Sequence, residues 1–405
     1  MSGTIESTAP ATSSGRRIDE IDILRGFALF GILVTNVIVA TTLFSFGGTR
    51  EELRPRYDGP ADHFVHALVT ALFEGRFYLL FAFLFGYSFT LQIAAAQRAG
   101  VSERARLLRR CAALMAIGLV HVYLLWIGDI LTLYAFLCLI LILLRKIRPR
   151  TAIITGIVLY GVWSAQMFLP GAGEDAYEAM ALFIDLPALH ADYVGSPAAT
   201  FDVQTSLFPG FLLLIWFAQG VTSLAMFLFG LAAGKRGLFE DPETVRRWTP
   251  RVLLLGYGLG LPVSAVTFAG TMSWLAPPSW WGGIQMLVAP LMTFAYIATV
   301  LIAARSVRTG RFAAWLAPAG RMAASNYIGQ SIVLMVLYTG YGFALADKVP
   351  PAAVLGFAVL TFAAQLLLSR WWLRGHKYGP VEWLLRAVTY LSRPPWRRTI
   401  PAASP

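Results

Sequence analysis

The chain has 405 residues, of which 57% are apolar and only 14% are charged. Soluble domains carry about a quarter charged residues, so this composition excludes a soluble enzyme, a disordered chain and a disulfide scaffold. The net charge of +11 would suggest nucleic acid in a soluble protein. Here the charges follow the loops of a membrane protein, and we expect no nucleic-acid partner. Cys111 and Cys138 lie in apolar runs and are predicted to be buried thiols.

The chain begins with residues 1–15, which are rich in Ser, Thr and Ala and are predicted to be disordered. The apolar stretch that follows Arg16 and Arg17 has no small-residue cleavage pattern, so we expect a retained span and no cleaved signal peptide. A membrane-spanning helix needs about 20 mostly apolar residues. By that measure ten spans are predicted, at 24–46, 77–96, 108–126, 130–144, 151–169, 209–233, 251–272, 283–304, 322–346 and 352–370.

The positions of Lys and Arg predict the topology. With the N-terminus in the cytoplasm, all but five of the 33 Lys and Arg residues fall on the inner side, as the positive-inside rule requires. The five on the outer side are Arg50, Arg54, Arg56, Arg76 and Lys348. One missed or extra span would invert every later loop. We therefore expect an all-α, polytopic bundle of about ten spans over residues 16–377, with both termini cytoplasmic.

Three further segments complete the predicted organisation. The outer loops 47–76 and 170–208 are acidic and are mostly expected to be solvated, and residues 61–73 could form an interfacial helix before the second span. Residues 378–405 are predicted to form a cytoplasmic interfacial helix and a tail. Gly379 and Pro380 supply the entry turn of that helix, while Glu382 and Arg386 are spaced to pair across one turn.

Glu382 has two interpretations. It could form a solvated pair with Arg386, or it could turn inward to Arg25 or Arg321 and close the inner mouth of the bundle. We favour the inward position. Replacing an inward carboxylate that pairs with arginine, as in Glu382→Gln, would destabilise the protein more than loss of a solvated pair.

Polar residues within spans are costly and therefore mark candidate sites. His121 lies 11 residues beyond Arg110, and Asn36 lies 11 beyond Arg25, so both sit about 17 Å deep at 1.5 Å per residue. Gln330 lies about 14 Å beyond Arg321 by the same rise. Asn36 and Gln330 fit interhelical hydrogen bonding best. His121 fits helix association and a chemical role equally well.

Asp129 follows His121 by eight residues, just over two helical turns, so both side chains can face one cavity. A carboxylate that orients a histidine is a recurring arrangement in general-base catalysis. Asp129 could instead cap the fourth span, and one residue could do both. The chain has no phosphate-binding loop, no zinc-protease motif and no Cys/His set with metal spacing, so we expect no metal.

Ionisable residues also gather at both ends of the bundle. At the outer mouth of the second span, Glu74 and Arg76 could form an ordinary salt bridge or line an opening, and His66 lies just upstream together with His63. At the inner end of the first span, Asp22 and Arg25 are three residues apart and can pair on one helix face. Arg25 is also an ordinary anchor at the membrane surface.

Four stretches resemble the YeiB-like family of bacterial inner-membrane proteins of unknown function. The first runs from Asp22 to Asn36, and the second from Arg109 to Ala135 with Gly118, His121, Gly128-Asp129-Ile130-Leu131 and Tyr134. The other two are Gly320-Arg321-Met322-Ala323-Ala324-Ser325-Asn326-Tyr327 with Gln330-Ser331, and Tyr378-Gly379-Pro380-Val381-Glu382-Trp383-Leu384-Leu385-Arg386 with Thr389-Tyr390. The resemblance covers nearly the whole chain. It implies a multi-pass inner-membrane location and adds Tyr134, Arg321 and Asn326 to the candidate binding residues.

The YeiB-like family is similar to the transmembrane acyltransferases, which include sugar O-acetyltransferases and the heparan glucosaminide N-acetyltransferase. The O-acyltransferases carry a catalytic histidine fourteen residues after the opening aspartate, where this chain has Asn36. The heparan-acetylating relatives resemble this chain in having Asn there, with a histidine further along, for which His63 and His66 are the nearest candidates.

The resemblance implies an acyltransferase that moves an acyl group, plausibly acetyl from acyl-CoA, to a small-molecule or glycan acceptor at or across the membrane. In this hypothesis His121 is the base or acyl relay, Asp129 orients it, and Asn36 donates a hydrogen bond. The alternative is a transporter or exporter that uses the same polar cavity. A membrane partner for another protein is a third possibility. Membrane lipid is a partner in every case.

Overall fold

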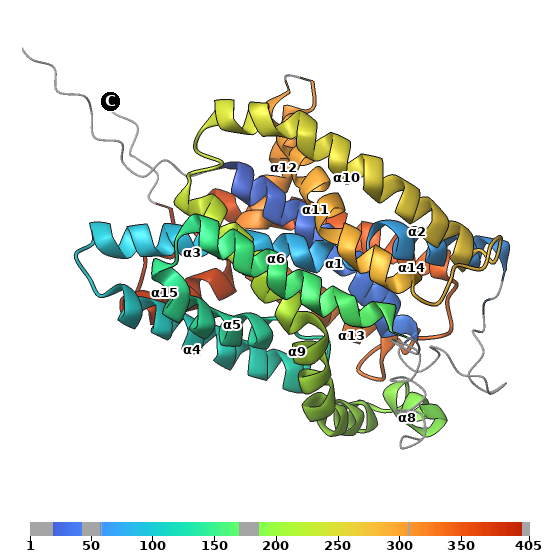
Figure 1. The fold of residues 1–405 in the computed structure, drawn as a ribbon. Helices are drawn as coiled ribbons and strands as arrows, with labels where there is room; N and C mark the ends of the chain where they lie inside the picture. Colours follow the sequence, from blue (N-terminus) through green and yellow to red (C-terminus); the bar gives the residue numbers. More distant parts are fainter. Residues whose placement is uncertain (1–18, 43–56, 58, 170–185, 307, 399–405) are drawn as a thin grey trace, which may run out of the picture.

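The computed structural model describes residues 19–42, 57, 59–169, 186–306 and 308–398. Within this part of the chain the regular elements are helices, and one isolated bridge joins His376 to Arg397, which confirms the predicted all-α class. The helices pack into one bundle (Figure 1). In chain order they are α1 (Asp19–Thr42), α2 (Pro60–Leu72), α3 (Phe77–Arg98), α4 (Glu103–Leu124), α5 (Leu131–Leu143), η2 (Leu144–Lys146), α6 (Pro149–Ala165), η3 (Gln166–Phe168), α8 (Leu186–Tyr193), α9 (Pro197–Lys235), α10 (Pro242–Thr271), α11 (Trp281–Arg305), α12 (Gly310–Arg321), α13 (Ala323–Tyr338), α14 (Pro351–Gly375) and α15 (Pro380–Tyr390).

Eight helices in the described part are long and apolar enough to cross a membrane, so the chain is a multi-pass membrane protein. Two further predicted spans, 130–144 and 322–346, correspond to the shorter helices α5 and α13, with 13 and 16 residues. These helices are about 20 and 24 Å long at 1.5 Å per residue, less than the roughly 30 Å of a hydrocarbon core. The count of ten spans and the cytoplasmic termini stay predictions.

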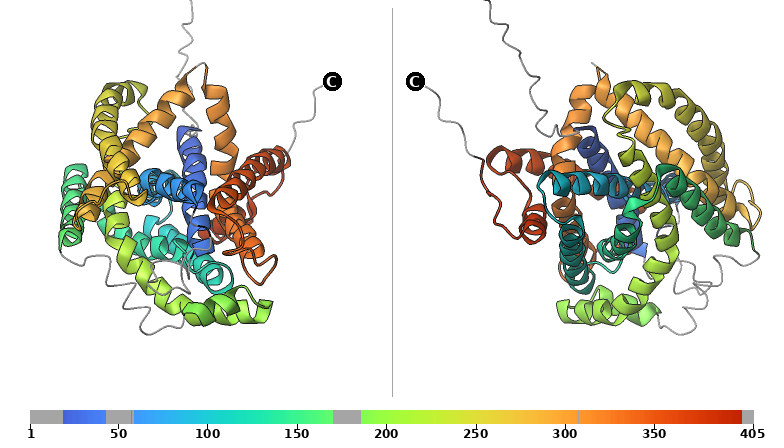
Figure 2. Two further views of the ribbon diagram at one scale, coloured as in Figure 1. Left: turned by 90° about the vertical axis from the view of Figure 1, so that its right-hand side faces the viewer. Right: turned by 60° about the vertical axis from the view of Figure 1, so that its left-hand side comes forward.

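The bundle has a packed interior and an apolar outer surface. Figure 2 shows α1 and α3 in the middle, with the other helices around them. Large side chains such as Trp126, Tyr87 and Tyr338 are fully buried there. On the outside, Leu254 of α10 and Val162 of α6 are 73% and 70% exposed. Such apolar exposure is typical of a surface that faces lipid tails.

Two helix crossings depend on glycine. A Cβ atom added at Gly230 of α9 would lie 2.0 Å from the Phe83 carbonyl oxygen of α3. One added at Gly320 of α12 would lie 1.8 Å from the Asp22 carbonyl oxygen of α1. Small residues let membrane helices approach this closely, where packing and not the hydrophobic effect drives association. The second crossing brings Arg25 and Arg321 to the same end of the bundle.

Several predicted boundaries need correction. The outer loop predicted at 170–208 is partly helical, because α8 and the first turns of α9 lie within it. Helix α9 continues through Pro209, where the predicted span began, and it is visibly bent (Figure 2), as proline within a helix causes. The helices predicted at 61–73 and 378–390 are observed as α2 and α15. The segment 1–15, most of 47–58 and 170–185 lie outside the described residues.

Candidate functional site

His121 lies at the centre of a continuous hydrogen-bonded chain of three side chains. Its Nδ1 is 2.8 Å from Oδ1 of Asp129, and its Nε2 is 2.8 Å from Oγ of Ser331. All three residues are only 1% exposed. We call this set the serine–histidine–aspartate chain. With Nδ1–H donating to the carboxylate, the lone pair of Nε2 faces the serine hydroxyl, which is the arrangement that activates a serine as a nucleophile.

The turn between α4 and α5 brings His121 and Asp129 together. Helix α4 ends at Leu124, and the chain reverses over residues 125–130 before α5 begins. The other carboxylate oxygen of Asp129, Oδ2, accepts a 2.7 Å hydrogen bond from the Thr132 N–H at the start of α5. The two sequence interpretations of Asp129 therefore coexist, because one oxygen caps the helix and the other orients the imidazole.

Ser331 was missing from the predicted site, although the sequence carries a signal for it. It lies ten residues beyond Arg321. Counted along the predicted span 322–346, this gives about 15 Å, close to the depth that the same count gives for His121. The same depth argument that selected His121 would have selected this hydroxyl. A serine is easily overlooked because its hydroxyl can bond its own helix instead, and Ser331 has this second choice in the Tyr327 carbonyl, 3.4 Å from its Oγ.

Tyr327 separates the serine–histidine–aspartate chain from a cavity. Its ring lies 5.1 Å from the His121 ring, centroid to centroid. Its hydroxyl accepts a hydrogen bond from the Ile130 N–H at 3.3 Å and donates one to the Gly128 carbonyl at 3.4 Å. Tyr327 also lines the cavity, so its ring contacts both the cavity and the imidazole.

The neighbouring face of α13 carries a different cluster. The side chain of Gln330 donates to the Leu29 carbonyl of α1 at 3.3 Å and to Oε1 of Gln365 on α14 at 2.9 Å. Gln365 donates to the Asn326 carbonyl, and Asn326 donates to Ser369 Oγ, both at 2.9 Å. We call these four residues, Asn326, Gln330, Gln365 and Ser369, the amide cluster. It joins α13 to α1 and α14.

The structure therefore does not gather all of the predicted polar residues at one site. Gln330 and Asn326 belong to the amide cluster, one residue out of register with Tyr327 and Ser331. Asn36 of α1 is half-buried, and among the described residues it makes no hydrogen bond to either cluster. Its predicted role as a donor beside His121 stays a prediction without a supporting contact.

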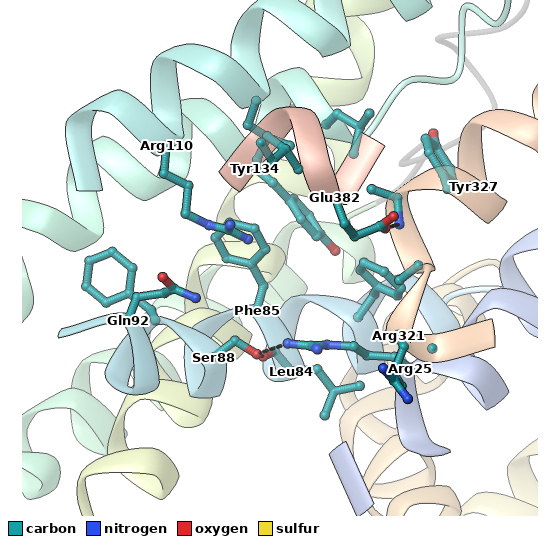
Figure 3. A pocket seen from close by; sticks show the side chains of 18 of the residues that line it. Arg25, Leu84, Phe85, Ser88, Gln92, Arg110, Tyr134, Arg321, Tyr327 and Glu382 are labelled. Atoms are coloured by element: carbon teal, nitrogen blue, oxygen red, sulfur yellow. Dashed lines mark hydrogen bonds between the residues drawn. The ribbon is translucent and has the colours of Figure 1, made fainter. Parts of the chain in front are cut away.

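A cavity of about 190 Å³ lies where α1, α3, α4, α5, α12, α13 and α15 meet. Figure 3 shows arginines reaching it from different helices, among them Arg25, Arg110 and Arg321. The predicted residues Tyr134, Glu382 and Arg386 also line it. Arg25 is held in place by Asp22, with 3.2 Å between Nη1 and Oδ1, and by the Ser88 hydroxyl. Tyr134 donates its hydroxyl to the Tyr78 carbonyl at 2.9 Å.

Glu382 turns inward, as predicted, and its hydrogen bonds go to the start of α13. Oε1 accepts from the Ala324 and Ser325 N–H groups at 2.7 and 3.2 Å, and Oε2 accepts from the Ser325 hydroxyl at 2.6 Å. The predicted partners were Arg25 or Arg321. A helix N-terminus offers unsatisfied N–H donors and a positive dipole, which explains this preference. Burial raises the pKa of the Glu382 carboxyl, and the bonds from Ser325 and Ala324 partly offset that rise.

The candidate residues at the predicted outer mouth, His66, Glu74 and Arg76, do not line this cavity. Arg76 is 5% exposed and donates to the carbonyls of Thr70 and Glu74. The Arg76 carbonyl accepts a 3.1 Å bond from Thr293 of α11. Arg76 thus closes the turn between α2 and α3 and fixes it to the bundle. His66 is half-buried on α2, and Glu74 is half-buried in the turn that follows α2.

No metal centre is formed by the described residues, since no group of three His, Cys, Asp or Glu side chains there could hold an ion. Cys111 and Cys138 are free, buried thiols. The side chains at the site offer hydroxyl, imidazole, carboxylate and guanidinium groups.

One family model and two curated relatives show what this chain is similar to. Residues 233–392 match a family model described as a protein of unknown function (DUF418). The uncharacterised protein YxaH of Bacillus subtilis (strain 168) is 29% identical over 96% of this chain and 98% of its own length. The uncharacterised protein YeiB of Escherichia coli (strain K12) is 27% identical over 91% of this chain and 95% of its own.

These matches confirm the resemblance to uncharacterised YeiB-like proteins that the four motifs predicted. The family model covers α13, α14 and α15, and so includes Tyr327, Ser331 and Glu382 but not His121 or Asp129. The full-length relatives extend the similarity across both halves of the site. None of their names states a reaction, so the similarity to acyltransferases stays a prediction.

Proposed function

We propose that this YeiB-like membrane protein transfers an acyl group through Ser331, with His121 as the base and Asp129 as the residue that orients it. The observation that carries the proposal is the pair of 2.8 Å contacts on either side of the imidazole. Helix association alone needs no such order of groups. Asparagine, glutamine or serine can join helices without an ionisable ring, as the amide cluster on the adjacent face does.

The transfer proceeds in two balanced steps. Ser331 Oγ attacks the acyl carbonyl of the donor, its proton passes to His121 Nε2, and the bond from the acyl carbon to the leaving group breaks. The leaving group takes that proton from Nε2, which leaves an acyl-serine. In the second step an acceptor hydroxyl or amine gives its proton to Nε2 and attacks the acyl-serine, and Ser331 recovers its proton. Asp129 stabilises the transient imidazolium.

The donor we propose is acyl-CoA, and the acceptor a small molecule or glycan at the membrane. Because Ser331 is buried behind Tyr327, water has little access to an acyl-serine. Exclusion of water favours transfer to a bound acceptor over hydrolysis. The bacterial inner membrane is the proposed location, by its similarity to YeiB-like proteins.

Labelling of Ser331 tests this function. The protein in detergent is incubated with radioactive acetyl-CoA, and with an alkyl fluorophosphonate that reacts with activated serines. We expect covalent label on Ser331 by mass spectrometry and none in Ser331→Ala. In Asp129→Asn the rate of labelling should fall by about 10³-fold or more. Ser369→Ala is the matched control, because Ser369 is equally buried but belongs to the amide cluster.

Two results would sink the proposal. One is label that persists in Ser331→Ala at the wild-type rate. The other is a His121→Gln variant that folds normally and still releases coenzyme A at the wild-type rate. Counterflow of a substrate across liposomes, with no acyl release, would favour the transporter alternative.

A further inference from the structure

We infer that the cavity at the inner end of α1, α4 and α15 is a binding site for a phosphate-bearing ligand with an apolar tail. The cavity is lined by five cationic residues and one acidic residue. The cationic residues are Arg25, Arg110, Arg321, Lys377 and Arg386. This inference concerns binding alone and does not depend on chemistry at Ser331.

Asp22 pairs with Arg25, and the single acidic residue of the lining, Glu382, is engaged elsewhere. Both oxygens of Glu382 are used by the N-terminus of α13 and by Ser325. Among the described residues, no ion pair or hydrogen bond engages the side chains of Arg110, Lys377 or Arg386. Like charges that share an enclosed cavity repel one another more strongly than they would in water, so an anionic ligand is the natural counterpart.

An aromatic ring, not a carboxylate, holds the Arg386 side chain. The Arg386 guanidinium lies 4.4 Å from the centre of the Tyr378 ring and 5.8 Å from the centre of the Tyr390 ring. The Tyr390 ring also contacts Arg106, at 4.2 Å. Stacking uses the face of a guanidinium and leaves its N–H edge available. That edge matches two oxygens of a phosphate at once. Arg386 is therefore positioned for an anion before the anion arrives.

The positive-inside rule explains why these cations lie at this end of the bundle but not why they turn inward. A surface arginine extends its charge toward water. Arg110, Lys377 and Arg386 are instead half-buried around one cavity. Figure 3 shows Arg110 and Glu382 extending into the same space from different helices.

The rest of the cavity defines the remainder of the ligand. Its volume of about 190 Å³ has space for on the order of ten water molecules, enough for a phosphate or diphosphate group. Apolar side chains also line the cavity, among them Phe85, Phe89 and Leu114. A phosphate joined to an apolar chain fits this mixture of cationic and apolar groups. It could come from a soluble coenzyme or from a phospholipid headgroup.

Pyrophosphate is the probe that tests the site, with the full-length protein in nanodiscs of neutral lipid. We expect saturable binding, weakened at least tenfold in the Arg110→Gln, Arg386→Gln double variant. Arg246→Gln is the charge-matched control, since Arg246 is 80% exposed in a pair with Glu243, and it should bind within twofold of wild type. If the double variant does not fold, Lys377→Gln replaces it as the cavity variant, because Lys377 lies in the turn between α14 and α15 and also lines the cavity. Ser331→Ala should bind normally.

Two further arms identify the source of the phosphate. Competition by coenzyme A would assign the site to a soluble ligand. Competition only by phosphatidic acid added to the nanodisc would assign it to a lipid headgroup. Absence of pyrophosphate binding, or binding unchanged in both cavity variants, would overturn the inference.

Discussion

Helix α13 carries two polar clusters on adjacent faces, at nearly the same depth. The amide cluster joins α13 to α1 and α14 through groups that keep the same charge at every accessible pH. The serine–histidine–aspartate chain joins α13 to α4 through an ionisable ring between a carboxylate and a hydroxyl. Both clusters satisfy buried polar groups, but only the second can accept and release a proton. Depth and polarity alone therefore do not distinguish a site from interhelical hydrogen bonding.

Loss of the imidazole should have the largest effect on stability. His121→Leu leaves the Asp129 carboxylate buried without its cationic or N–H partner. We expect the free energy of unfolding to fall by about 3–5 kcal/mol, measured by titration with sodium dodecyl sulfate in mixed micelles. An effect below that of Gln330→Leu would remove the distinction between the two clusters.

The amide cluster should tolerate change better. Gln330→Leu leaves Gln365 Oε1 without its 2.9 Å donor, which costs about 1–3 kcal/mol. The double variant Gln330→Leu, Gln365→Leu should cost less than the sum of the single variants, because neither partner is then left unsatisfied. A double-mutant cycle in the same micelles measures this coupling, and strict additivity would contradict it.

Substitutions of Glu382 test whether its negative charge, or only its acceptor oxygens, stabilises the start of α13. The carboxylate serves as an acceptor for the start of α13, so Glu382→Leu should cost about 2 kcal/mol, as loss of a strong N-cap does. Glu382→Gln keeps one oxygen acceptor and should cost much less, which differs from the result expected for an arginine pair. Melting temperatures of the two variants in detergent decide between these roles.

The pH dependence of stability supplies an independent check on Glu382. Burial raises the pKa of Glu382 above its ordinary value of 4.5. At a pH between 4.5 and the pKa in the folded state, the folded state therefore holds more protons than the unfolded state. The contribution of Glu382 to stability is thus fully present below pH 4.5 and is lost as the pH rises through the folded pKa. Glu382→Gln should remove this slope. An unchanged slope would show that other groups produce it.

The smallest effect is expected at Asn36. This side chain is half-buried and bonds neither cluster among the described residues. Asn36→Leu should change the free energy of unfolding by no more than about 0.5 kcal/mol and should leave labelling of Ser331 intact. A loss of labelling with normal stability would return Asn36 to the site.

The sequence was sufficient for the fold class, for most of the long apolar helices and for the pairing of His121 with Asp129. Hydropathy, charge placement and an eight-residue spacing are local properties that a one-dimensional pattern records. The sequence pattern did not predict which face of α13 meets α4, because a rotation of the helix by one residue exchanges Gln330 for Ser331. That rotation is set by packing between helices far apart in the chain. For the same reason the carboxylate of Glu382 was expected to meet an arginine, whereas it meets backbone N–H groups.

The bonds from Glu382 to α13 also bear on how the protein is made. The carboxylate that completes the start of α13 lies 58 residues later in the chain than Ala324. A ribosome therefore delivers α13 to the membrane well before its cap exists. The cationic cavity, whose lining includes Lys377 and Arg386, is closed only when α15 docks. A nascent chain therefore exposes no finished cavity to ligands until α15 has been made.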